Sequence, residues 1–186
     1  MSQLLRHLSV AIALVAVTGS RVPAGTLQSE RTEPEAKAVL LQKVLAFVTW
    51  PKGEKPGPRP LKIAFIGQTP VARELTRLVN DRAAGNAPLE VHYEALDSNL
   101  DGYQVVFLSH SNARHAQALV DKTSSKPVLT VCDSAGGCDK GIILTLLVAE
   151  NRIRFEVNLK QARRAGLSFQ SQVLTYAARV CDGGAP

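Results

Sequence analysis

Aromatic residues, cysteines and histidines are scarce in this chain. Aromatic side chains make up 5% of its 186 residues, with a single Trp, and there are three cysteines and four histidines. So few cysteines exclude a dense disulfide scaffold, and no cysteine or histidine has the spacing of a zinc site. The signatures GxGxxG and GxxxxGK[ST] are also missing, which argues against a dinucleotide site or a P-loop. We therefore expect no cofactor and no metal.

Residues with catalytic potential are equally sparse. The histidines beyond the N-terminal segment are His92, His110 and His115, and none lies in a recognised nucleophile or metal motif. Ser109 and Ser111 flank His110 at the end of a predicted strand, where active sites of α/β proteins occur, yet no partnered carboxylate is evident. The sequence therefore predicts a protein that is not an enzyme.

A hydrophobic run long enough to span a bilayer is absent. The apolar run from Leu8 to Val17 follows Arg6 and His7 and is typical of a secretory signal, because it is too short for a spanning helix. Small residues precede a cleavage position after Ala24. Residues 1–24 are therefore predicted to be a signal peptide, and the mature protein is expected to be exported without membrane insertion.

The excess of basic charge is modest. The net charge of +6 falls to +4, from 20 basic and 16 acidic side chains, once residues 1–24 are removed. Lys and Arg are spread thinly without interleaved aromatics, which is unlike a nucleic-acid-binding surface, so no nucleic acid is expected as a partner. The remaining length suits one domain, predicted at residues 35–181, between a flexible leader at 25–34 and a flexible tail at 182–186.

Strand and helix patterns alternate along this domain. Helices are predicted at Glu35–Trp50, at Thr69–Asn80 with Thr69 as N-cap, and at Ser111–Lys122. Strands are predicted at 61–66, 89–93, 105–109 and 128–131. The segments 142–148 and 152–158, joined by a short polar link, have the pattern of an antiparallel hairpin. The expected fold is α/β, a single Rossmann-like domain with a mostly parallel sheet, this hairpin and C-terminal flanking helices.

The last predicted strand carries a row of polar side chains. Alternation puts Ile153, Phe155 and Val157 on one side and Arg152, Arg154, Glu156 and Asn158 on the other. Arg154 and Glu156 are candidates to bind a partner or a small zwitterionic ligand, or else they only cover the sheet. Asn158 is expected to cap the helix that follows. Trp50, beside Pro51, is either an interface anchor or a cap on the core.

Two of the three cysteines should form a disulfide in an exported protein. Cys132 and Cys138 bracket the Gly-rich segment DSAGG, whose flexibility lets its ends meet, so their pairing is the first choice. Cys181 is then free, paired across a homodimer, or an alternative partner to Cys132 or Cys138.

Several segments together resemble the YfiR/HmsC family. They are FVTWP at 47–51, KIAFIG at 62–67, VVFLS at 105–109, PVLTV at 127–131 and GIILTLLVAENRIRFEVNL at 141–159, and residues 165–180 resemble the family's C-terminal helix. The resemblance implies a periplasmic regulator that binds the sensory region of an inner-membrane diguanylate cyclase, represses cyclic-di-GMP synthesis and thereby controls biofilm formation. The alternative is a periplasmic protein that binds a small molecule and has no cyclase partner.

Overall fold

The computed structural model describes residues 31–51, 60–80 and 89–181. The chain divides into two units, residues 1–30 and 31–186, and every described residue belongs to the second. The predicted signal peptide, most of the predicted leader and the predicted tail at 182–186 lie outside the described residues. The helices are α1 (Glu33–Leu45), α2 (Pro70–Asn80), the 3-10 helix η2 (His110–His115), α3 (Ala116–Lys122), α4 (Leu159–Arg164) and α5 (Ser171–Leu174).

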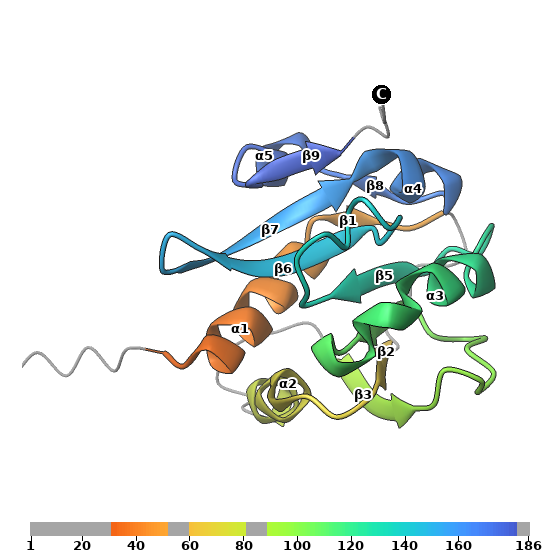
Figure 1. The fold of residues 1–186 in the computed structure, drawn as a ribbon, viewed down its shortest axis with the longest axis horizontal. Coiled ribbons are helices and arrows are strands. Elements are labelled where there is room, and N and C mark those ends of the chain that lie inside the picture. Colours follow the sequence, from red (N-terminus) through yellow and green to blue (C-terminus); the bar gives the residue numbers. More distant parts are fainter. Residues whose placement is uncertain (1–30, 52–59, 81–88, 182–186) are drawn as a thin grey trace, which may run out of the picture. The chain divides into compact units, whose positions relative to one another are not determined.

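Most strands form a mixed sheet of seven (Figure 1). The order across the sheet is β3 (Leu89–Glu94), β2 (Leu61–Ile66), β4 (Val105–Leu108), β5 (Leu129–Cys132), β6 (Leu144–Ala149), β7 (Arg152–Asn158) and β9 (Arg179–Cys181). The pairs from β3 to β6 are parallel, β6 and β7 are antiparallel, and β9 runs parallel to β7. The predicted α/β fold, mostly parallel with an antiparallel hairpin, is confirmed.

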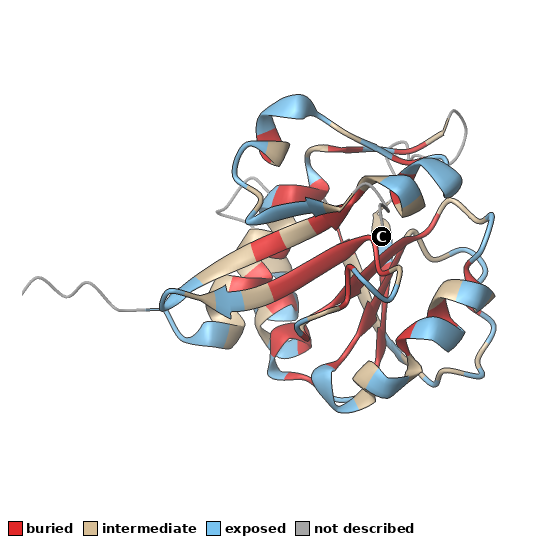
Figure 2. Ribbon diagram, turned by 45° about the horizontal axis from the view of Figure 1, so that its top comes forward, coloured by how far each residue is buried: buried red, intermediate tan, exposed pale blue. Residues whose placement is uncertain are grey.

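Helices cover both faces of this sheet. On what we call the first face, α1 and α2 pack on alternate strand residues, including Phe65, Phe107 and Leu146. On the second face, α3 packs on the residues between them, including Val106 and Leu108. Figure 2 shows that the central strands are buried along most of their length. This burial on both faces explains why β4 and β5 read as continuous apolar runs.

The predicted helix caps are present. Thr69 Oγ1 accepts a hydrogen bond from the Val71 N–H at 3.3 Å at the start of α2, and Asn158 Oδ1 accepts from the Gln161 N–H at 2.9 Å at the start of α4. Each cap satisfies a backbone donor that the first helical turn leaves unpaired. The hairpin link is a tight turn in which Glu150 and Asn151 have φ values of 52° and 56°, the left-handed pair that matches the twist of the two strands.

The first predicted helix extends too far at its C-terminal end. α1 ends at Leu45, and Val48 and Thr49 form the two-residue strand β1, which pairs antiparallel with β8 (Ser168–Phe169). Val and Thr are β-branched, and the residue before a proline is disfavoured in helical backbone, so the segment before Pro51 is extended.

The predicted C-terminal helix at 165–180 is wrong. α4 ends at Arg164, and Gly166 follows with a φ of 71°, a conformation that does not continue a helix. The rest of the segment contributes β8, the single-turn helix α5 and β9. Pairing with β1 and β7 therefore outweighs the local helical spacing, since it satisfies backbone groups along the sheet.

Candidate functional site

The polar row of β7 lies on the second face of the sheet, with Phe155 and Val157 buried on the first. The structure directs the two charged candidates to different partners. Arg154 Nη2 lies 3.5 Å from Glu150 Oε2 in the hairpin turn. Glu156 instead accepts hydrogen bonds from Arg179 of β9, at 3.1 Å from Nε and 3.0 Å from Nη2. Arg154 and Glu156 therefore do not share one ligand as they stand.

Arg179 joins three segments of the chain. Besides Glu156, its guanidinium donates to both carboxylate oxygens of Asp139, each at 3.0 Å. Two-pronged pairs of this kind fix orientation as well as distance. Hydrogen bonds from Arg179 lower the pKa of Asp139, and the two carboxylates raise the pKa of Arg179. We call Asp139, Glu156 and Arg179 the arginine clasp, which ties the loop after β5 to β7 and β9.

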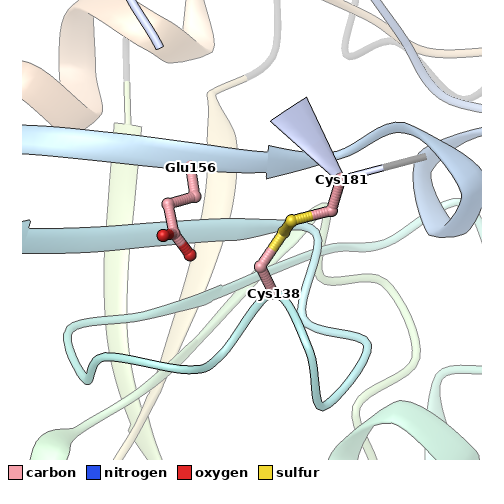
Figure 3. Close-up of side chains that lie close together, drawn as sticks. All are labelled: Cys138, Glu156 and Cys181. Atoms are coloured by element: carbon pink, nitrogen blue, oxygen red, sulfur yellow. A yellow bond between two sulfur atoms is a disulfide. The ribbon is translucent and has the colours of Figure 1, made fainter. Parts of the chain in front are cut away.

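The disulfide lies beside the clasp and is not the predicted one. Cys138 pairs with Cys181 (Figure 3). Cys132 is a free, buried thiol. The predicted Cys132–Cys138 bridge is therefore wrong in this structure, and Cys181 is the alternative partner. The physical reason is the sheet, because β9 pairs Cys181 with Asn158 at the end of β7, and the Asn158 amide donates to the Cys138 carbonyl at 2.9 Å.

Cys132 is enclosed by its own loop. Its thiol lies 3.5 Å from the Ser134 carbonyl oxygen and 3.7 Å from Thr145 Oγ1. A methyl group on Gly137 would collide with the Cys132 sulfur, so the loop lies directly on the thiol. Burial raises the pKa of Cys132. A thiol that is buried and held in its protonated form is poorly reactive.

Three potential metal-ligating atoms lie within 4.8 Å of one another, on the side chains of Cys138, Glu156 and Cys181 (Figure 3). The two sulfurs are bonded to each other and offer no thiolate, and Glu156 is held by Arg179. Metal ligation by cysteine requires the thiolate form. This group of three side chains therefore joins the loop after β5 to β7 and β9.

Trp50 is a core residue. Its side chain is buried, with 6% exposure, in the cluster on the first face of the sheet. Its indole Nε1 is also buried and has no hydrogen-bond partner among the residues that the structure describes. Trp50 thus lies on the face opposite Arg154 and Glu156, and the three predicted site residues do not converge on one surface.

Two exposed apolar side chains lie near the β9 edge of the sheet. Tyr176, between α5 and β9, is 73% exposed, and Val180 on β9 is 38% exposed. β9 is an edge strand of the seven-stranded sheet. Sequence reasoning missed this surface because it assigned residues 165–180 to a helix. An edge strand with exposed apolar side chains is a common docking surface for another chain.

A comparison with protein families decides the relationship of this chain. A family described as YfiR/HmsC-like matches residues 34–178. The chain belongs to the YfiR/HmsC-like family. Members of this family are periplasmic, non-catalytic regulators in diguanylate cyclase signalling. The resemblance inferred from the sequence is confirmed, and the match ends one residue before β9.

Solved structures share the fold of this YfiR/HmsC-like protein. A conserved domain protein from Vibrio cholerae O1 biovar El Tor strain N16961 superposes with a TM-score of 0.54 at 11% identity, over 80% of this chain and 60% of that one. The ABC domain in complex with L-Trp from Streptococcus pneumonia gives a TM-score of 0.55 at 9% identity, over 79% of this chain and 60% of that one. The chain thus spans about three fifths of each protein. At such identities the likeness concerns the fold alone. None of the helices in the described part of the chain has the length and apolar content to cross a membrane.

Proposed function

We propose that this protein binds the periplasmic sensory region of an inner-membrane diguanylate cyclase and represses cyclic-di-GMP synthesis. The observation that carries the proposal is the YfiR/HmsC-like match over residues 34–178. A regulator of this kind needs a stable scaffold and an exposed patch, because its output depends on binding another chain. The exposed Val180 on the edge strand β9 and Tyr176 shortly before it offer such a patch.

The polar row of β7 offers charge near the same edge of the sheet, on its second face, whereas Val180 pairs with Val157 and lies on the first face. The side chain of Arg154 is 39% exposed, and its ion pair with the exposed Glu150 is weak enough to exchange for a carboxylate of a partner. Glu156 acts by fixing Arg179, and Trp50 acts by packing in the core on the first face of the sheet. We therefore assign direct contact to Arg154 and Tyr176, and a supporting role to Glu156 and Trp50.

Deletion of the gene in its native host tests the function. Cellular cyclic-di-GMP should rise, and a plasmid copy of the wild-type gene should bring it back to the parental level. Unchanged cyclic-di-GMP under several growth conditions would refute cyclase repression and favour a periplasmic small-molecule binding protein.

Complementation with variants tests the surface. Arg154→Glu and Tyr176→Ala should leave cyclic-di-GMP high, because both side chains are at least partly exposed and neither belongs to the core. Tyr93→Ala is the matched control, since Tyr93 is 47% exposed on β3 at the opposite edge of the sheet. It should complement fully. Full complementation by all three variants would remove the β7–β9 edge from the proposal while leaving the function standing.

A further inference from the structure

A pocket lies at the carboxyl edge of the parallel strands. It has a volume of about 400 Å³ and is lined by Glu33, Lys37, His110, Asp133, Ser134, Ala135, Leu147 and Val148. His110 follows β4, and Asp133 and Ser134 follow β5, so the strand ends deliver these side chains to one place. The carboxyl edge of a parallel sheet is where α/β proteins bind ligands. Pockets for small molecules fall in this range of volume.

The adjacent crevice at the reversal of strand order is filled by the protein itself. Between β2 and β4 the Gly67 backbone has a φ of 87°, and a side chain there would collide with Ser109 and Asn112. The Asn112 amide donates to Ser109 Oγ at 3.1 Å and to Ser111 Oγ at 3.2 Å. The open space at this edge therefore lies further along the sheet, beside the carboxyl ends of β4, β5 and β6.

Lys37 and Glu33 form a neutral pair on one wall of the pocket. The Lys37 side chain is 8% exposed, and its Nζ lies 2.7 Å from Glu33 Oε1, one helical turn earlier on α1. A buried ammonium is stable only with such a partner. On the opposite wall, Ser134 Oγ and His110 Nδ1 share a hydrogen bond of 2.9 Å. These four side chains thus satisfy one another in pairs.

Asp133 is the charged residue left over in the pocket. Its Oδ1 is buried and has no hydrogen-bond partner among the described residues. Burial raises the pKa of Asp133, while the charge of Lys37 and N–H groups of Asp133 and His110 act in the other direction. A buried acceptor without a donor is costly to keep, and a ligand donor would relieve that cost.

We propose that this pocket binds a small molecule that carries an ammonium group and a short apolar portion. The ammonium supplies the donor that Asp133 Oδ1 lacks, because the direct ion pair of Lys37 is with Glu33. Leu147, Val148 and Ala135 provide the apolar part of the lining. The proposal goes beyond cyclase binding and does not depend on it, since it rests on residues of α1, η2, the loop after β5 and β6, and not on β7 or β9.

Three four-carbon probes test the charge preference: butylammonium, butyrate and 1-butanol, each titrated into the ¹⁵N- and methyl-labelled protein at neutral pH. Butylammonium should shift the amide signals of His110 and Ser134 and the methyl signals of Leu147 and Val148 in a saturable way, with butanol weaker. Stronger binding of butyrate would overturn the ammonium assignment, because it would mark the pocket as an anion site. No saturable shift from any probe would overturn the pocket as a ligand site.

Two variants test the residues. Asp133→Asn keeps the shape and removes the charge, so the dissociation constant of butylammonium should rise roughly tenfold or more, the effect of losing a charged hydrogen bond. Asp121→Asn is the control, because Asp121 is exposed on α3 and outside the pocket lining. If Asp133→Asn does not fold, Val148→Arg serves instead, since Val148 is 49% exposed and an added cation there should repel the probe. Unchanged affinity in the folded variant would refute the proposal.

Discussion

Removal of the Cys138–Cys181 disulfide should destabilise the protein far more than removal of the free thiol. The bridge joins residues separated by 43 positions. Closing a loop of that length lowers the entropy of the unfolded chain by an amount worth about 4 kcal/mol at 25 °C, whereas a Cys132–Cys138 bridge would contribute only roughly 2 kcal/mol. Cys181→Ala should therefore lower the free energy of unfolding by about 4 kcal/mol, and Cys132→Ala by about 1 kcal/mol as a single buried substitution.

Urea unfolding under non-reducing conditions measures these changes. With a slope of about 2 kcal/mol per molar urea, Cys181→Ala should lower the midpoint by about 2 M. The free energy of unfolding of Cys181→Ala should also depend more steeply on urea concentration, because the unfolded chain without the crosslink exposes more surface. Alkylation of the unfolded wild-type protein followed by peptide mapping should label Cys132 alone. A larger loss from Cys132→Ala than from Cys181→Ala, or labelling at Cys181, would refute the connectivity and the loop argument built on it.

Further predictions concern Trp50, Asp133 and Gly137. Trp50→Ala should lower the free energy of unfolding by about 3–5 kcal/mol in urea, because it empties a core site, while the exposed Tyr176→Ala should change it by less than about 0.5 kcal/mol; equal effects would contradict the core assignment. The folded Asp133 carboxyl keeps its proton to a higher pH than the unfolded one, so wild-type stability should fall as the pH rises from about 4 through the raised pKa. The Asp133→Asn variant should lack this loss of stability with rising pH. If the melting temperatures of both proteins changed with pH in the same way across this range, the prediction would be wrong. Gly137→Ala should cost about 1–3 kcal/mol by overpacking against Cys132, and Cys132→Ala in the same chain should recover part of that loss in a double-mutant cycle.

The sequence predicted the parallel half of the fold well because its elements are locally encoded. β2 and α2 have the predicted bounds, and the caps at Thr69 and Asn158 have the predicted partners. The hairpin was predictable from the alternation in 152–158, since one face of that strand is buried and the other is covered only in part.

The C-terminal segment could not be predicted in the same way. β8 and β9 are two and three residues long, and each is defined by a partner far away in sequence, β1 or β7. The disulfide and the arginine clasp depend on that distant pairing, so Cys181 and Arg179 gave no local signal of their contacts. The pocket was partly predictable from the sequence, because His110 and Asp133 lie just after buried strands. The contribution of Lys37 was not, because it depends on how α1 packs.

Asp133 also shows why a neighbour in sequence can mislead. Its position beside Cys132 and the glycines predicts a residue of a flexible disulfide loop. In the structure it directly follows the last residue of β5, and its side chain lines the strand-end pocket. In the loop that follows, Gly137 packs directly against the side chains of Cys132 and Thr145. A glycine there therefore allows close packing as well as a turn of the chain.

The positions of the three cysteines make correct oxidation depend on the order of events during folding. An oxidant that meets the chain from its N-terminal end encounters Cys132 and Cys138 before Cys181, and those two are separated by only five residues. Closure of the loop over Cys132 and its contact with Thr145 of β6 remove that thiol from the competition. If oxidation comes first, the nearest pair forms a bridge that must be broken again by exchange before β9 can join the sheet. The protein therefore needs either a sheet that closes faster than its thiols react or an isomerase that corrects the first pairing.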